Sequence, residues 1–156
     1  MSAASASTAT TDPTERQRPM PAEDPSAPSE GRPLGGQHAL VLGAGVAGLA
    51  AAVALRQRGA RVSVLEQAPR ITEVGAGLQI SPNGTRVLEA LGIDPQSLGD
   101  RSEAVELRDQ QGHLVTRLDL PQDGPGFWLC HRADLIAGLE NRCRALETPV
   151  QLLQKV

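Results

Sequence analysis

The chain has 156 residues, a formal net charge of −3 and a sequence pI near 5.6. This mildly acidic balance excludes a general attraction to nucleic acid or anionic membranes, and the near absence of aromatic residues argues against a base-stacking surface. The length allows one domain but not comfortably two, and no apolar run reaches the ~18 residues of a membrane span. Two cysteines, Cys130 and Cys143, form no CxxC pair and indicate reduced thiols in a cytoplasmic protein.

Residues 1–36 differ in composition from the rest of the chain. They are dominated by Ser, Ala, Thr and Pro and have no apolar periodicity. Such a segment cannot offset its ordering entropy by burial, so we expect a disordered tail over 1–36 and a structured part over 37–156. The segment has no continuous apolar stretch of the kind found in signal peptides, and its acidic residues disfavour a transit peptide.

The structured part opens with the alternation typical of an α/β fold. Residues 38–42, HALVL, form a short apolar run suited to a buried parallel strand. GAGVAG then leads into an Ala-rich helix that Gly59 ends, and a second strand, ARVSVLEQ, carries Glu66 at its carboxyl end. We therefore predict a Rossmann-like βαβ unit with a right-handed crossover.

Further elements are predicted downstream, in chain order. We expect a loop over 73–84, EVGAGLQISPNG, and then a helix capped by Ser81 or Asn83. Val87, Leu88 and Leu91 are predicted to share one face of that helix, and IDPQSLGD is expected to be a loop. The remaining prediction is a hairpin around the QQG turn, a short strand at FWLC, a helix with a stripe of Leu135, Leu139, Cys143 and Leu146, and a strand at PVQLLQKV.

The glycine loop predicts dinucleotide binding. Gly43 permits a tight turn out of the strand, Gly45 lets a pyrophosphate approach the backbone, and Gly48 allows close packing of helix on strand. The helix amino terminus offers free N–H groups to the phosphates. Glu66 lies where an acidic side chain accepts hydrogen bonds from a ribose, which favours an adenosine without a 2′-phosphate. The loop alone does not distinguish NAD from FAD.

A second GAG at residues 75–77 repeats the letters of the first. It could be a duplicate nucleotide loop, a turn with no chemistry, or part of one larger site shared with the first loop. No strand is expected to feed it and no ribose acid follows it, so the duplicate loop is disfavoured. We expect it to form the other end of a single site.

Three features together resemble the amino-terminal region of the single-component FAD-dependent aromatic hydroxylases, of the salicylate and hydroxybenzoate hydroxylase type. They are the glycine loop with Glu66, the segment VGAGLQISPNG, and HRADL at residues 131–135. The resemblance runs from about residue 38 to the end. It implies a Rossmann-like FAD-binding domain, incomplete here, and a monooxygenase that uses NADH or NADPH and O2 to hydroxylate a small aromatic substrate. The hard chemistry in such enzymes belongs to the cofactor.

The resemblance also implies roles for individual residues. Glu66 would hold the adenosine ribose, followed by Gln67 where relatives often have Arg, and Arg132 would reach the phosphate and ribitol region. The stretch from Gly75 to Gln79 would pass beside the flavin, and Val156 would lie against the adenine. We assign no catalytic residue and no metal ligand. The implied cofactor-binding residues are Gly43, Gly45, Ala47, Gly48, Glu66, Gln67, Gly77, Gln79, Arg132 and Val156.

Full members of this family are more than twice as long and carry a later GD motif and a β-sheet substrate domain. We therefore expect an amino-terminal fragment, a truncated gene product or a gene-model artefact that binds FAD weakly and turns over nothing. Two other classes stay open: the nicotinamide-binding domain of a dehydrogenase, and a non-catalytic nucleotide-binding module. Within the flavoproteins, an epoxidase or a reductase acting on isoprenoid chains is a further alternative.

Overall fold

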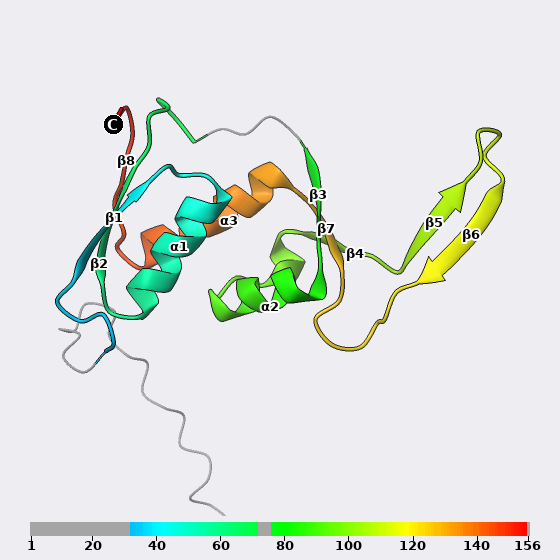
Figure 1. Cartoon of the computed structure of the whole chain (residues 1–156), viewed down its shortest axis with the longest axis horizontal. Coiled ribbons are helices and arrows are strands. Elements are labelled where there is room, and N and C mark those ends of the chain that lie inside the picture. The colour runs from blue at the N-terminus through cyan, green and yellow to red at the C-terminus, as the bar shows by residue number, and fades with distance from the viewer. Residues whose placement is uncertain (1–31, 72–75, 156) are drawn as a thin grey trace, which may run out of the picture.

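A computed structural model describes residues 32–71 and 76–155 of the chain (Figure 1). Residues 1–31 of the predicted tail lie outside the described residues. Arg32 to Gly36, which we assigned to the tail, form turns, and Leu34 packs against the core and donates its N–H to Arg58 O at 3.0 Å. Ordered contacts therefore begin before residue 37.

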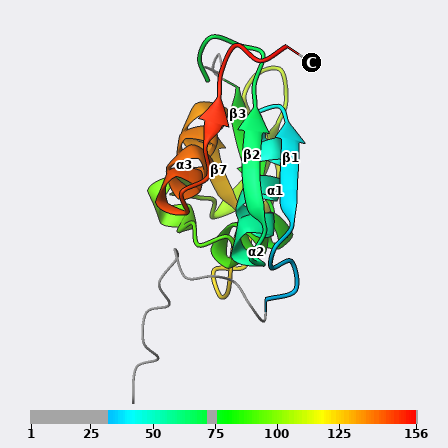
Figure 2. The ribbon, with the colours of Figure 1, turned by 90° about the vertical axis from the view of Figure 1, so that its left-hand side faces the viewer.

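A parallel sheet forms one end of the molecule (Figure 2). Its strands are β1 (His38–Leu42), β2 (Arg61–Leu65) and β8 (Val150–Gln151), in the order β1-β2-β8. The helix α1 (Val46–Gln57) crosses from β1 to β2, which pair in parallel from His38↔Arg61 to Leu42↔Leu65. Val62 and Val64 of β2 are buried beneath α1 with Leu49 and Val53 of the helix. The predicted βαβ unit is confirmed.

A second helix, α3 (Arg132–Ala145), packs against α1 and leads into β8 (Figure 1). Each of these helices is followed by a strand of the parallel sheet, so each runs against the strand direction and begins on the carboxyl side of that sheet. Leu135, Leu139 and Cys143 are buried between the helices and Leu146 is half-buried, which confirms the predicted stripe. This arrangement brings the starts of α1 and α3 to the same side.

Three antiparallel strands form a second small sheet, in the order β3 (Gly77–Ile80), β7 (Trp128–His131), β4 (Gly99–Arg101). We expected loops over 77–80 and over 99–100, and these predictions were wrong. Each strand is only three or four residues long and pairs with β7, far away in sequence, so local patterns carry no signal for it. Gly99 is needed here because a Cβ at that position would overlap Leu129 O in β7.

The helix α2 (Pro82–Ala90) is capped by Ser81, whose hydroxyl accepts a hydrogen bond from Gly84 N at 3.5 Å. Leu88 and Leu91 are buried as predicted, but Val87 is 55% exposed, so its assignment to the same face was wrong. The buried position is taken by Thr85, whose hydroxyl donates to Gly126 O at 3.3 Å. A short 3-10 turn, η2 (Pro95–Ser97), follows within the predicted loop.

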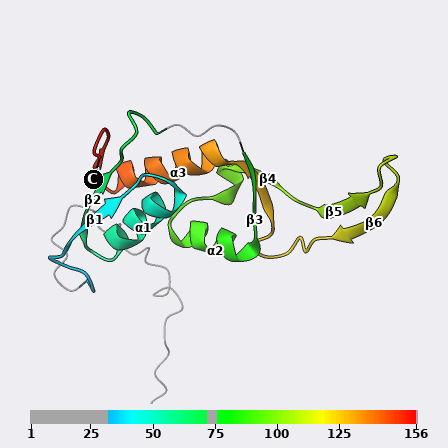
Figure 3. The same ribbon diagram turned by 45° about the horizontal axis from the view of Figure 1, so that its top comes forward.

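The predicted hairpin is formed by β5 (Ala104–Arg108) and β6 (Leu114–Asp119). It extends away from the rest of the molecule (Figures 1 and 3). Asp109 organises its turn by accepting hydrogen bonds from Gln111 N at 2.9 Å and His113 N at 2.8 Å. In the part of the chain that the structure describes, no helix is long and apolar enough to cross a membrane.

Candidate functional site

The glycine loop joins β1 to α1 at the carboxyl edge of the parallel sheet. Gly43 has a φ of +95°, a conformation that side-chain-bearing residues rarely adopt, and its N–H donates to Leu65 O at 2.7 Å. Gly45 is the N-cap of α1, and no side chain caps the helix there. The first N–H groups of α1 are therefore without a side-chain acceptor at their end of the helix, which is the arrangement that binds phosphate at helix amino termini.

Gly45 and Gly48 have different roles in this loop. A Cβ at Gly48 would overlap Gly43 O and would lie 3.4 Å from Val41 Cγ1, so Gly48 is required for the helix to lie on the strand. A Cβ at Gly45 would meet no atom within 4 Å. Packing does not require Gly45, and the absence of a side chain there leaves the backbone open to close approach. Ala47, the remaining predicted residue of the loop, is exposed.

Glu66 ties the end of β2 to the glycine loop. Its Oε2 accepts the N–H of Ala44 at 2.7 Å, and its Oε1 accepts the N–H of Ala68 at 2.8 Å. The hydrogen bond from Ala44, with those from Ala68 and Gln67, holds the pKa of Glu66 below its usual value of 4.5. The carboxylate is therefore ionised at neutral pH, and its remaining lone pairs are open to ribose hydroxyl donors.

A pocket of about 270 Å³ lies beside this carboxylate. It is lined by Leu42, Gly43, Leu65, Glu66, Gln67 and Gln154. The chain after β8 curls back over the end of β2, because Gln154 N donates to Glu66 O at 2.9 Å and Leu153 N to Ala68 O at 3.2 Å. The predicted ribose residues, Glu66 and Gln67, thus line one hollow together with Gly43 of the glycine loop.

The second group of predicted residues lies where β3 meets the start of α3. Gly77 is opposite His131 in the strand register, and Arg132 N donates to Ala76 O at 3.0 Å. The second GAG and the HRADL segment are therefore neighbours through backbone pairing. Gln79, two residues further along β3, is exposed, and a Cβ at Gly77 would meet nothing within 4 Å.

The packing of α1 against α3 relates the two groups to each other. One group stands at the start of α1 and the end of β2, and the other at the start of α3 and on β3. Both helices begin on the carboxyl side of the parallel sheet, where open α/β folds bind nucleotides. Gly75 and Val156, also assigned to the site, lie outside the described residues.

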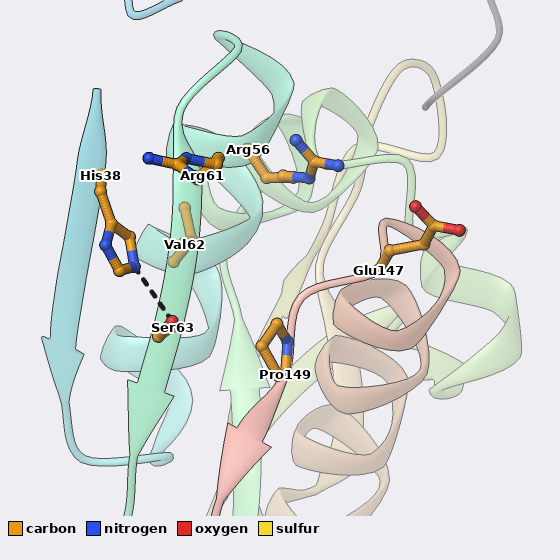
Figure 4. Close-up of a pocket in the computed structure, with 7 residues that line it drawn as sticks. All are labelled: His38, Arg56, Arg61, Val62, Ser63, Glu147 and Pro149. Carbon is orange, nitrogen blue, oxygen red and sulfur yellow. Dashed lines mark hydrogen bonds between the residues drawn. The ribbon is translucent and has the colours of Figure 1, made fainter. Parts of the chain in front are cut away.

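A separate pocket of about 300 Å³ opens at the opposite, amino-terminal edge of the parallel sheet (Figure 4). Its lining includes His38, whose Nε2 pairs with Ser63 Oγ at 3.1 Å, and Arg56, whose Nε donates to Leu146 O at 2.8 Å. None of the predicted cofactor residues contributes to it.

Neither cysteine is equipped for nucleophilic chemistry. Burial raises the pKa of the Cys130 thiol, and burial together with the nearby Glu140 raises that of Cys143 to about 11. Both thiols are therefore protonated at neutral pH. The described residues contain no group of three or more His, Cys, Asp or Glu side chains that could hold a metal ion.

The fold and this site define a dinucleotide-binding α/β protein. The model of the NAD(P)-binding Rossmann-like domain family matches residues 41–87, from the end of β1 into α2. That match covers the glycine loop and Glu66 and confirms the predicted fold class.

The individual proteins that the chain resembles are flavin-dependent monooxygenases. The chain is 55% identical over 104 residues to the 3-hydroxybenzoate 6-hydroxylase of Polaromonas naphthalenivorans, which covers 62% of this chain and 26% of the relative. It is 39% identical over 124 residues to the FAD-dependent monooxygenase OpS4 of Beauveria bassiana, covering 73% of this chain and 29% of the relative. The chain thus spans less than a third of the length of the curated relatives it matches.

A solved structure that resembles this chain also contains FAD. Klebsiella pneumoniae HpxO, complexed with FAD and uric acid, superposes with a TM-score of 0.67 at 28% identity, over 77% of this chain and 31% of HpxO. The homologues of this chain are therefore hydroxybenzoate monooxygenases and other FAD-dependent oxygenases, and the resemblance predicted from the sequence is confirmed.

Two features of the site are absent from the sequence prediction. The hydrogen bond from Ala44 to Glu66 and the return of Gln154 onto the end of β2 both join residues far apart in the chain. The hydrogen bond from Ala44 to Glu66 can be expected from the sequence only where an acidic residue at the end of the second strand occurs together with the glycine loop. No sequence signal marks Gln154, because its contact depends on the turn at Leu153, which has a φ of 59°.

Proposed function

We propose that this chain binds FAD as the nucleotide-binding part of a flavin-dependent monooxygenase that hydroxylates a small aromatic substrate with NADH or NADPH and O2. The observation that carries the proposal is the likeness to a hydroxybenzoate hydroxylase at 55% identity over 104 residues, much more of the chain than the glycine loop and Glu66 alone. Many dinucleotide-binding folds share that loop, so the wider likeness is what favours a flavin over a nicotinamide.

In this proposal the first group of residues holds the ADP half of the cofactor. The free N–H groups at Gly45 and the start of α1 bind the diphosphate, with Ala47 and Gly48 behind them. Glu66 and Gln67 bind the adenosine ribose in the pocket beside Gly43. Because Glu66 also accepts the N–H of Ala44, the same carboxylate positions the loop and the ribose relative to each other.

The second group serves the flavin end. Arg132 is the first residue of α3, which begins on the same side as α1, and its guanidinium is proposed to bind the phosphate and ribitol chain. Gly77 and Gln79 on β3 are proposed to pass beside the ring, where the small Gly77 lets the backbone approach. The bound flavin supplies the redox and oxygen chemistry, and these residues bind and orient it.

For the substrate, we propose only a chemical class. The Polaromonas relative is a 3-hydroxybenzoate hydroxylase, and we propose a related hydroxylated aromatic acid as substrate. The chain covers 26% of that relative. We therefore expect this chain alone to bind FAD weakly and to show no hydroxylation.

Titration of the purified chain with FAD, FMN and NADH, followed by flavin or nicotinamide fluorescence, tests the proposal. Because the first group would bind the ADP half, we expect FAD to bind at least tenfold more tightly than FMN, which lacks that half. We also expect FAD to bind more tightly than NADH. NADH binding more tightly than FAD would instead favour the dehydrogenase alternative.

A further inference from the structure

The pocket at the amino-terminal edge of the parallel sheet lies outside the proposed cofactor site. Its volume of about 300 Å³ is at the lower end of the range for small-molecule pockets, which is on the order of 300–1,000 Å³. The starts of β1 and β2 and the segment that leads into β8 contribute its walls (Figure 4). The glycine loop and Glu66 follow the other ends of β1 and β2, so a ligand in this pocket would be separate from the dinucleotide.

The pocket is cationic although the chain as a whole is acidic. Its lining carries two guanidinium groups, those of Arg56 and Arg61, and one carboxylate, that of Glu147. Two positive charges and one negative charge leave a formal charge of +1 with His38 neutral, against −3 for the whole chain. A concave surface in which one sign of charge prevails concentrates ligands of the opposite sign. The lining therefore favours an anion.

Arg56 is fixed in the wall of the pocket by the main chain. Its Nε donates to Leu146 O at 2.8 Å and its Nη1 donates to Ala60 O at 3.5 Å. The guanidinium thus joins the end of α3 to the turn before β2. A charged group held in this way loses little conformational freedom when an anion binds beside it.

Arg61 supplies the second positive charge from the first position of β2. The residue is exposed, and its side chain makes no hydrogen bond or ion pair with the described residues. A guanidinium presents its N–H donors in a planar fork that matches two oxygens of an oxyanion. Arg61 is therefore able to bind an oxyanion through two hydrogen bonds, next to the fixed charge of Arg56.

His38 and Ser63 add a neutral donor to this lining. His38 Nε2 pairs with Ser63 Oγ at 3.1 Å, between β1 and β2 (Figure 4). When Nε2 carries the proton, the imidazole donates to Ser63 Oγ, and the hydroxyl hydrogen remains to be donated to a ligand. Donors from two guanidinium groups and one hydroxyl match the three terminal oxygens of a phosphate better than the two oxygens of a carboxylate.

Glu147 is the one group of the lining that opposes an anion. It follows α3 with a φ of 52°, in the left-handed region where helix ends favour glycine. A carboxylate at the carboxyl end of a helix is also disfavoured by the helix dipole. Removing this charge should therefore strengthen the binding of an anion, which gives a test opposite in sign to the removal of an arginine.

We propose that this pocket binds the phosphate group of a small ligand, either free phosphate or a phosphate monoester. Arg61 and the Ser63 hydroxyl contact the phosphate oxygens, and Arg56 adds its charge from the wall. The ligand joins the starts of β1 and β2 to the segment before β8, so its binding stabilises the folded chain. This site goes beyond the proposed function, because the FAD diphosphate is assigned to the opposite edge of the sheet.

Two arginines near the start of β2 provide a matched pair of variants. Arg61→Met removes a charge from the pocket, and Arg58→Met removes the same charge at the end of α1, outside the lining. Arg58 is exposed and donates its Nη1 to Ala54 O at 3.2 Å. Both variants have the same net charge, so a difference between them reports the pocket. Without phosphate, we expect both to unfold within a few degrees of wild type.

The test follows the backbone amide NMR signals of the full chain during titration with inorganic phosphate and with glycerol 3-phosphate, at constant ionic strength. We expect saturable shifts at Arg61–Ser63 and at Glu147. The affinity should fall at least tenfold in Arg61→Met, stay unchanged in Arg58→Met, and rise severalfold in Glu147→Gln. Tighter binding of glycerol 3-phosphate than of phosphate would identify a phosphate monoester as the ligand, and equal binding would identify free phosphate.

Three results would overturn the proposal. They are the absence of saturable shifts at these amides, shifts confined to the glycine loop, and equal affinities in Arg61→Met and Arg58→Met. Weaker phosphate binding in Glu147→Gln would also contradict it, because an anion gains from the loss of a carboxylate. Failure of the chain to bind FAD would leave this site standing, since the phosphate response is measured at the other edge of the sheet.

Discussion

The Glu66 carboxylate accepts the backbone N–H of Ala44 at 2.7 Å, across 22 residues of sequence. Through this bond the acid at the end of β2 holds the glycine loop at the end of β1. The side chain that we propose for the ribose therefore also holds the loop that we propose for the diphosphate, and its loss should weaken both contacts with the ADP moiety.

Glu66→Gln is expected to weaken FAD binding by roughly tenfold, since hydrogen bonds to a charged acceptor contribute about 1.5–3 kcal/mol. The amide can still accept one N–H, so the fold is retained. FAD titration by fluorescence measures the effect. Glu89→Gln, at an exposed carboxylate of α2 outside the proposed site, serves as a control. An unchanged affinity in Glu66→Gln would contradict the assigned role.

The stability of the chain at acidic pH should depend on the same hydrogen bond between Ala44 and Glu66. The pKa of Glu66 is lowered in the folded state, so its contribution to stability is complete above the unfolded value of 4.5. That contribution is lost as the pH falls through the lower folded value. Thermal unfolding at pH 6 and pH 3 should show a larger loss for wild type than for Glu66→Gln. Equal losses would show that the carboxylate is not held by the loop.

Gly48→Ala and Gly45→Ala should separate a structural glycine from a ligand-binding one. A Cβ at Gly48 overlaps Gly43 O, so we expect Gly48→Ala to destabilise the fold by about 1–3 kcal/mol. A Cβ at Gly45 meets no atom within 4 Å, so Gly45→Ala should fold normally and lose FAD affinity. Thermal unfolding, followed by the fluorescence of Trp128, measures the change in stability, and FAD titration measures the change in affinity. Normal FAD affinity in Gly45→Ala would contradict the proposal that the diphosphate binds at this loop.

Arg132→Met is expected to lower FAD affinity by roughly tenfold without lowering the unfolding temperature by more than a few degrees, because a charge-assisted bond to phosphate would be lost. Arg144→Met is the control. Arg144 lies in the last turn of the same helix and pairs with Glu140 at 2.9 Å. Equal FAD affinities in the two variants would make Arg132 a structural residue of α3.

Gly77→Leu tests whether β3 passes beside the flavin. A Cβ at Gly77 meets nothing within 4 Å and its φ is not in the left-handed region, so the fold should accept a larger side chain. We expect loss of FAD affinity with little change in unfolding temperature. An unchanged affinity for FAD would show that the second GAG leads into β3 and takes no part in FAD binding.

The sequence predicted the parts of the fold that local patterns encode. The βαβ unit, the hairpin and the stripe on α3 follow from periodicity and turn residues within a few positions of one another. The strands β3 and β4 could not be predicted, because three or four residues become a strand only when β7 pairs with them. Val87 was misplaced because Thr85, a polar residue, takes the buried position by bonding to Gly126 O. At the site, the glycine loop and Glu66 were readable, whereas Gln154 reaches the pocket through a turn that has no sequence signature.

Hydrogen exchange of the backbone amides, with FAD or ADP added to the chain, tests most directly whether the two groups of residues form one site. We predict that ADP slows exchange at the glycine loop and at Glu66–Ala68, and that FAD slows exchange there and also at Ala76–Ile80 and Arg132. FAD that protects only the first group, as ADP does, would contradict a single site that extends from the glycine loop to β3.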